Sequence, residues 1–98
     1  MIKHIVMFKL LDKNKTNIEK AVDALKSLEK NIDVLRSLEV GVNFTQSERS
    51  HDIVLITEFD NREALNLYRP HPKHLPVIEI MQTLCSNSVV VDYEFSLA

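Results

Sequence analysis

The order of apolar patterns along the chain constrains its fold more than any other feature. In four stretches, aliphatic and β-branched side chains either alternate with polar ones or run together, as they do in strands: residues 2–11, 38–46, 53–59 and 89–95. Such stretches are too short to span a membrane and too regular for loops. The sequence therefore predicts four strands.

Two helical regions separate these strands. Through residues 18–35, apolar side chains recur every three or four positions, which predicts one long amphipathic helix with its cap at Thr16 or Asn17. The second region begins after Asp60, which forms a capping-box pattern with Glu63.

Three prolines divide the second helical region. Pro70 and Pro72 have no amide hydrogen, and each pushes the preceding residue toward extended geometry, so the first short helix ends before them. A second short helix begins between Pro72 and Pro76, because Pro76 is tolerated only in a first turn. The element order is therefore strand, helix, strand, strand, divided helix, strand.

This order is the βαββαβ arrangement of an α+β, ferredoxin-like domain, with a four-stranded antiparallel sheet and its helices on one face. We expect residues 1–98 to form one such domain. The first, third and last strands are apolar on both faces, whereas one layer of helices covers only one face of the sheet. We therefore expect a homodimer in which the open sheet faces of two copies pack together into an α/β barrel.

Composition excludes several classes of function. A formal charge of −2, with basic and acidic residues interspersed, argues against a nucleic-acid partner. Gly41 is the only glycine, which rules out glycine-rich phosphate-binding loops. Cys85 has no second cysteine to pair with, and its apolar neighbours indicate a buried, inert thiol. No apolar run approaches a membrane span, so we expect a cytoplasmic protein without a membrane partner.

The segment from Tyr68 to His74 is the candidate site, because it gathers residue types that are scarce in this chain. An imidazole is the natural base near neutral pH, so His74 is a candidate general base. Tyr68 is a candidate donor to a developing enolate or oxyanion. The alternative is structural: Tyr68 packs its ring and bonds a backbone carbonyl, while His74 caps a helix.

A metal site is a weaker interpretation of the same segment. His71 and His74 have a spacing that suits two ligands on one helical turn, but a third ligand would have to come from His4, Asp52 or Glu58. Nothing in the sequence requires that ligand, so we expect neither a metal nor another cofactor.

Two functions remain open from the residues alone. In the first, an apolar cavity between sheet and helices binds or transforms a small hydrophobic ligand, and besides Tyr68 and His74 its wall contains His4, Val6, Phe8, Leu25, Val40, Val42 and His71. In the second, the protein only assembles and its interior is filled. Asp92 is the acid most suited to partial burial, paired with a basic group at a strand end or across the dimer.

Several segments resemble the stress-responsive A/B barrel (Dabb) domain family. The matching residues are Lys3 to Leu10, Gly41 to Asn43, Asp52 to Leu55, Tyr68 to His74 and Val91 to Tyr93, with Tyr-x-x-His-Pro-x-His the most specific of these motifs. The resemblance implies a dimeric ferredoxin-like protein, in a family where most members have no assigned chemistry.

The resemblance also implies an alternative function, a cofactor-independent polyketide cyclase that closes a ring by aldol condensation or related lyase chemistry. By similarity to such cyclases, His74 would be the general base, Tyr68 would bind and polarise the substrate, and His4 would lie in the pocket. This chain departs from them at Ile53, which replaces a pocket histidine, and around Leu25, where a pocket tyrosine is missing.

Overall fold

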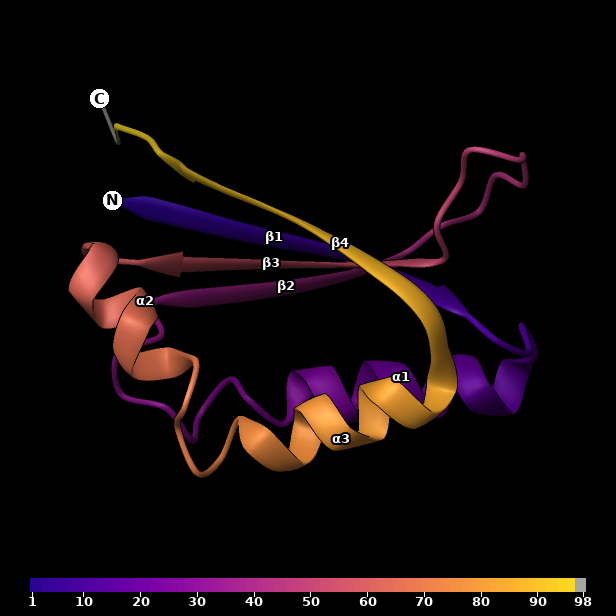
Figure 1. Ribbon diagram of the computed structural model, residues 1–98, viewed down its shortest axis with the longest axis horizontal. Coiled ribbons are helices and arrows are strands. Elements are labelled where there is room, and N and C mark those ends of the chain that lie inside the picture. Colours follow the sequence, from indigo (N-terminus) through magenta and orange to yellow (C-terminus); the bar gives the residue numbers. More distant parts are fainter. Residues whose placement is uncertain (97–98) are drawn as a thin grey trace.

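The computed structural model describes residues 1–96 of the 98-residue chain, and it confirms the predicted order of elements. The helices and strands are β1 (Ile2–Leu10), α1 (Lys15–Lys26), β2 (Ser37–Val42), β3 (Ile53–Phe59), α2 (Arg62–Tyr68), α3 (Leu75–Leu84) and β4 (Cys85–Glu94). Figure 1 shows the four strands as one layer and the helices as a second layer beneath it.

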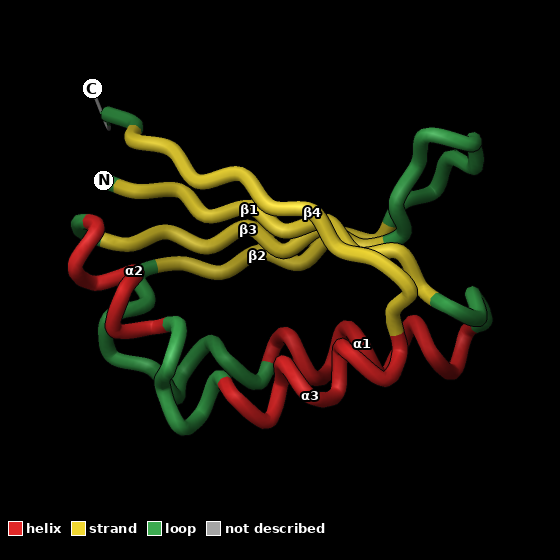
Figure 2. Tube along the Cα trace, viewed as in Figure 1, coloured by secondary structure: helices red, strands yellow, loops and turns green. Residues whose placement is uncertain are grey.

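The strands form one antiparallel sheet in the order β2-β3-β1-β4. The two central strands, β1 and β3, are not consecutive in the sequence, as in a ferredoxin-like fold. All three helices lie against the same face of this sheet (Figure 2). The predicted fold class is therefore confirmed.

The two faces of the sheet have different environments. On the helical face, Ile53, Leu55 and Phe59 of β3 are buried with much of the helical layer. On the open face, Ile5 pairs with Ile56 and with Val91, and the side chain of Val91 is 56 % exposed. The described residues thus leave an apolar surface across the open face of three adjacent strands.

The first helix is shorter than predicted. Its N-cap is Asn14, whose side chain accepts a hydrogen bond of 2.8 Å from the amide of Asn17, so the expected cap at Thr16 or Asn17 is wrong. The helix ends at Lys26, where the Asn31 side chain donates to the Ser27 carbonyl and competes with helical hydrogen bonding.

The apolar pattern beyond that helix belongs to a series of turns. Leu28, Ile32 and Leu35 are buried although they lie outside α1. Turns can bury residues three or four apart just as a helix does, which is why the pattern predicted a helix through residue 35.

The second strand also ends early, at Val42 instead of Gln46. The Asn43 side chain donates to the His51 carbonyl at 2.7 Å and accepts from the Thr45 amide at 2.9 Å, which turns the chain out of the sheet. Phe44 is consequently 98 % exposed. The loop between β2 and β3 projects away from the helices (Figure 1).

The second helical region is divided as the prolines predicted, with α2 ending at Tyr68 and α3 beginning at Leu75. The predicted cap is wrong by one residue: the side chain of Asn61, not that of Asp60, accepts from the Ala64 amide at 2.8 Å. Asp60 instead pairs with Arg36. The last strand begins at Cys85, four residues before the predicted start. The prediction began too late because the polar residues 86–88 carry no strand-like apolar pattern.

Candidate functional site

A cavity of about 440 Å³ lies between the sheet and the helical layer. Its wall is mostly apolar, and none of the described residues that line it is an aspartate, glutamate, lysine or arginine. The lining consists of His4, Val6, Phe8, Leu25, Leu28, Leu55, Tyr68, His74, Val77, Ile78, Met81, Gln82, Cys85, Ser86, Asn87 and Ser88. This volume lies within the range of about 300–1,000 Å³ that is typical of small-molecule sites.

Tyr68, the last residue of α2, is fully buried at one end of this cavity. Its ring is tilted against Phe59, with the centroids 4.9 Å apart, and it stacks on the imidazole of His74 at 4.0 Å. Its hydroxyl oxygen is buried and has no hydrogen-bond partner among residues 1–96. Burial raises the pKa of Tyr68, so the phenol stays neutral and able to donate.

His74 lies at the N-cap position of α3, but its side chain makes no capping hydrogen bond. Its Nδ1 lies 3.0 Å from the carbonyl oxygen of Arg69. Because a carbonyl can only accept, Nδ1 carries the proton and Nε2 keeps its lone pair in the neutral ring. Removal from water lowers the pKa of His74, which favours this neutral, basic form.

His4, on β1, lines the same cavity as Tyr68 and His74. Its ring is almost fully buried and meets the Tyr68 ring edge-on, with the centroids 6.1 Å apart. Its Nδ1 bonds to Oδ1 of Asp92 on β4, and its backbone carbonyl accepts from the Thr57 hydroxyl at 3.1 Å.

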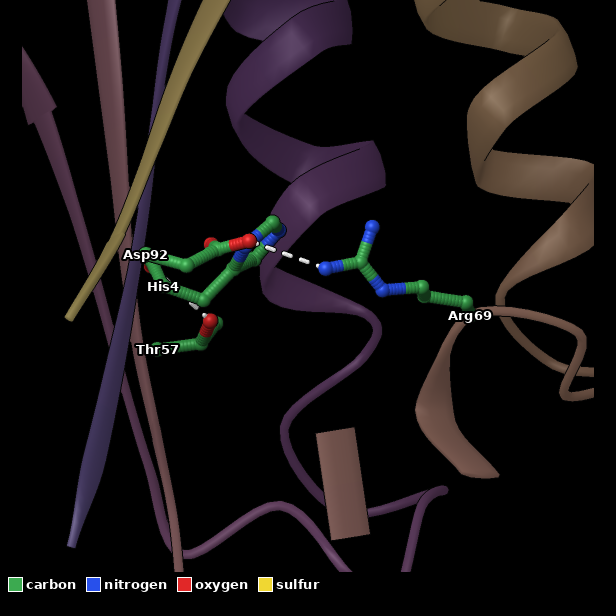
Figure 3. Close-up of polar contacts among 4 residues, drawn as sticks. All are labelled: His4, Thr57, Arg69 and Asp92. Atoms are coloured by element: carbon green, nitrogen blue, oxygen red, sulfur yellow. Dashed lines mark hydrogen bonds and ion pairs between the residues drawn. The ribbon is translucent and has the colours of Figure 1, made fainter. Parts of the chain in front are cut away.

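Asp92 bonds both to His4 and to the exposed side chain of Arg69. Its Oδ2 accepts from Nη2 of Arg69 at 2.9 Å (Figure 3). Partial burial works to raise the pKa of Asp92, but the hydrogen bonds and charges of His4 and Arg69 outweigh it and hold that pKa below its usual value. The sequence indicated a basic partner at a strand end or across a dimer, and the structure shows two partners within one chain.

The structure brings together most of the residues that the sequence placed in a pocket. Val6, Phe8 and Leu25 line the cavity with the two histidines and the tyrosine. Val40 instead packs against the buried core. Val42 lines a separate hollow with Met7 and His51, although its pairing with Ile53 places it on the helical face of the sheet.

His71 lies beside the cavity, not in its wall. Its Nδ1 accepts a hydrogen bond of 3.0 Å from the Lys73 amide, so the ring stabilises the turn before α3. Within the described residues 1–96, no three histidine, cysteine or acidic side chains come close enough together to hold a metal ion.

Helix α3 and the start of β4 supply lining residues that sequence reasoning missed. In α3, Ile78 lines the cavity, whereas Ile80 is 42 % exposed. Four polar lining residues, Gln82, Ser86, Asn87 and Ser88, had no pattern that could have identified them. Cys85 also lines the cavity and is half-buried, and burial raises the pKa of its thiol.

None of the described helices is long and apolar enough to cross a membrane.

Comparison with known proteins assigns this fold to a family. The chain is 30 % identical, over 98 residues, to an uncharacterised protein of Streptomyces coelicolor, and the match covers 97 % of this chain and all of that protein. It is 33 % identical to a dimeric protein of unknown function with a ferredoxin-like fold from Bacteroides fragilis, with a TM-score of 0.81 over 96 % of this chain and 95 % of that one.

A more distant structure shares the fold alone. A hydroxynitrile lyase from Passiflora edulis is 13 % identical, with a TM-score of 0.84 over 99 % of this chain and 94 % of that chain. Residues 2–95 match the stress responsive A/B barrel domain. The chain therefore belongs to the stress responsive A/B barrel (Dabb) domain family.

Proposed function

We propose that this protein binds a small, uncharged and mostly apolar molecule in the cavity and transfers a proton on it without a cofactor. His74 is the general base and Tyr68 is the hydrogen-bond donor. The observation that carries the proposal is the Tyr68 hydroxyl, which is buried in the cavity wall with no partner among the described residues.

A buried hydroxyl without a partner is unfavourable by about 1–3 kcal/mol, so such groups are uncommon unless a ligand completes them. A carbonyl or phenol oxygen of a ligand would accept from Tyr68 while the adjacent carbon–hydrogen or hydroxyl group faced His74. The base would take the proton and the phenol would stabilise the developing oxyanion. The apolar wall suits the rest of such a molecule.

This chemistry fits aldol condensation of a linear polyketide, or the cleavage of a related carbon–carbon bond. The fold of the hydroxynitrile lyase from Passiflora edulis is consistent with a lyase reaction. The unpartnered Tyr68 hydroxyl in the cavity wall favours ligand binding over a role in assembly alone.

Ligand binding is the first test. Uncharged ketones and phenols, from cyclohexanone to octanophenone, are screened for a rise in melting temperature, which reports binding by mass action. Tyr68→Phe should weaken binding by roughly fivefold, since a lost hydrogen bond costs about 1 kcal/mol. Tyr93→Phe is the matched control, because Tyr93 is 43 % exposed on the open face of the sheet. Equal affinities in the two variants would refute the role of Tyr68.

Proton transfer is the second test. Exchange of the α-hydrogens of a bound ketone with D₂O is followed by NMR, with the protein and with His74→Gln. A general base accelerates such a step by about 100-fold or more, so the variant should lose most of the acceleration. Unchanged exchange would remove His74 from the mechanism and leave a binding protein.

We also propose that two copies associate through the open sheet face, since the similar protein from Bacteroides fragilis is dimeric. The exposed apolar side chains of adjacent strands support this arrangement, because a second copy would cover them.

Neighbouring valines of β4 provide a matched test of this interface. Val91 is 56 % exposed on the open face, whereas Val90 is 55 % exposed and, by its pairing with Val6, lies on the helical face. Val91→Glu should shift the sedimentation mass from dimer to monomer at micromolar concentration, because it places a carboxylate in an apolar interface. Val90→Glu should remain dimeric. Two dimeric variants, or a monomeric wild type, would contradict the proposal.

A further inference from the structure

Arg69 is linked to both cavity histidines, directly to His74 and through Asp92 to His4. It lies at the C-cap of α2, directly after Tyr68. Its backbone carbonyl bonds to Nδ1 of His74 at 3.0 Å, and its guanidinium donates to Oδ2 of Asp92 at 2.9 Å. The other oxygen of Asp92 bonds to Nδ1 of His4 (Figure 3).

These contacts specify the same tautomer in both rings. The Arg69 carbonyl can only accept, so Nδ1 of His74 donates. The Asp92 carboxylate also accepts, so Nδ1 of His4 donates as well. In each neutral ring Nε2 is then left with its lone pair, and both imidazoles contact the ring of Tyr68.

We propose that Arg69 is a positioning residue for both imidazoles, acting on His74 through its carbonyl and on His4 through Asp92. The cavity wall then contains a second proton-transfer group, His4, whose ring also contacts Tyr68. A substrate oxygen bound to the Tyr68 hydroxyl would have two groups nearby that can take or return a proton. This catalytic meaning rests on the proposed function, whereas the positioning itself does not.

The guanidinium matters because it takes one particular oxygen of Asp92. A guanidinium can only donate hydrogen bonds, so Arg69 requires an acceptor atom of residue 92 to face it. The remaining carboxylate oxygen is thereby directed to His4. Arg62 makes a similar link from α2 to β4, through Glu94, but its side chain is 79 % exposed and neither partner bonds to an imidazole. Arg62 is therefore the matched control.

An isosteric change at Asp92 tests this arrangement. In Asp92→Asn, Arg69 should hold the amide oxygen, so the amide NH₂ faces His4 and Nδ1 must accept. The proton of His4 should then move to Nε2. Replacing Arg69 as well, in Arg69→Met/Asp92→Asn, frees the amide to rotate, so His4 should populate both tautomers. Arg62→Met/Asp92→Asn should keep the displaced tautomer.

The tautomer is read from the ring carbon-13 and nitrogen-15 chemical shifts of His4, at a pH about two units above the ordinary imidazole pKa of about 6.5. His74 is an internal control, because its partner is a backbone carbonyl that none of these substitutions removes. The readout needs no ligand, so it stands or fails separately from the proposed function.

Two results would overturn the inference: His4 keeping its Nδ1–H tautomer in Asp92→Asn, or the Arg69 and Arg62 double variants giving the same tautomer. If Asp92→Asn does not fold, Arg69→Met alone decides the matter. Loss of the Arg69 guanidinium in this variant should raise the pKa of the Asp92 carboxyl, measured by carbon-13 NMR, because Arg69 contributes to holding that pKa low. An Asp92 pKa that moves no more than in Arg62→Met would refute the link.

Discussion

Removing the hydroxyl of Tyr68 should make the ligand-free protein more stable. The side chain is fully buried, and its oxygen has no partner within residues 1–96. Tyr68→Phe keeps the ring and its contact with Phe59, so the packing is preserved while an unsatisfied polar group is removed. Functional groups in cavities often reduce stability in this way.

The magnitude follows from the desolvation of one hydroxyl. An unpaired buried polar group costs about 1–3 kcal/mol, so we expect the free energy of unfolding to rise by at least about 1 kcal/mol. For a domain of this size, 1 kcal/mol corresponds to a melting temperature about 4–8 °C higher. Tyr93→Phe should change the free energy by less than about 0.5 kcal/mol when the variants are compared in the monomeric Val91→Glu background, because Tyr93 is 43 % exposed in the single chain.

Urea denaturation followed by circular dichroism measures both variants, after unfolding and refolding to remove any bound molecule. All samples must have the same protein concentration, because association contributes to apparent stability. A Tyr68→Phe variant less stable than wild type by about 1 kcal/mol would show that the hydroxyl makes a favourable hydrogen bond. The argument that a ligand completes it would then be wrong.

Three further predictions concern charge, capping and a buried carboxylate. Burial lowers the pKa of His74, so the unfolded chain binds the proton more tightly than the folded chain does. The free energy of unfolding should therefore fall as the pH decreases through about 6.5. Urea titrations across this range should show a smaller fall in the free energy of unfolding for His74→Gln. Asn61→Ala should lower the free energy of unfolding by about 1 kcal/mol through loss of the α2 cap, whereas Asn66→Ala, at an exposed position in the same helix, should not. Asp52→Ala should lower the melting temperature more than Asp52→Asn, since only the asparagine retains an oxygen for the buried Leu10 amide.

Capping shows how a local motif can be nearly right. Asp60 and Glu63 matched a capping box, but Asp60 bonds to Arg36, which is distant in the sequence, and Asn61 caps the helix. Both residues are good caps in isolation. A partner brought by the fold decided between them.

The candidate site shows a similar division. Tyr68 and His74 could be selected from the sequence because scarce residue types and prolines coincide there, and the structure places both in the cavity wall. The contact of Asp92 with His4 and Arg69 could not be predicted, since it joins three elements through the register of β1 and β4.

The sequence by itself determined the element order, the fold class and the presence of an apolar open face, because periodicity and proline geometry act over a few neighbouring residues. Only the tertiary structure decided where α1 and β2 end, which residues line the cavity and which carboxylate holds His4. These features depend on side chains from distant segments meeting in three dimensions. For the segment from Tyr68 to His74, local sequence supplied the chemical groups, and packing supplied the buried hydroxyl and the oriented imidazole that make it a candidate site.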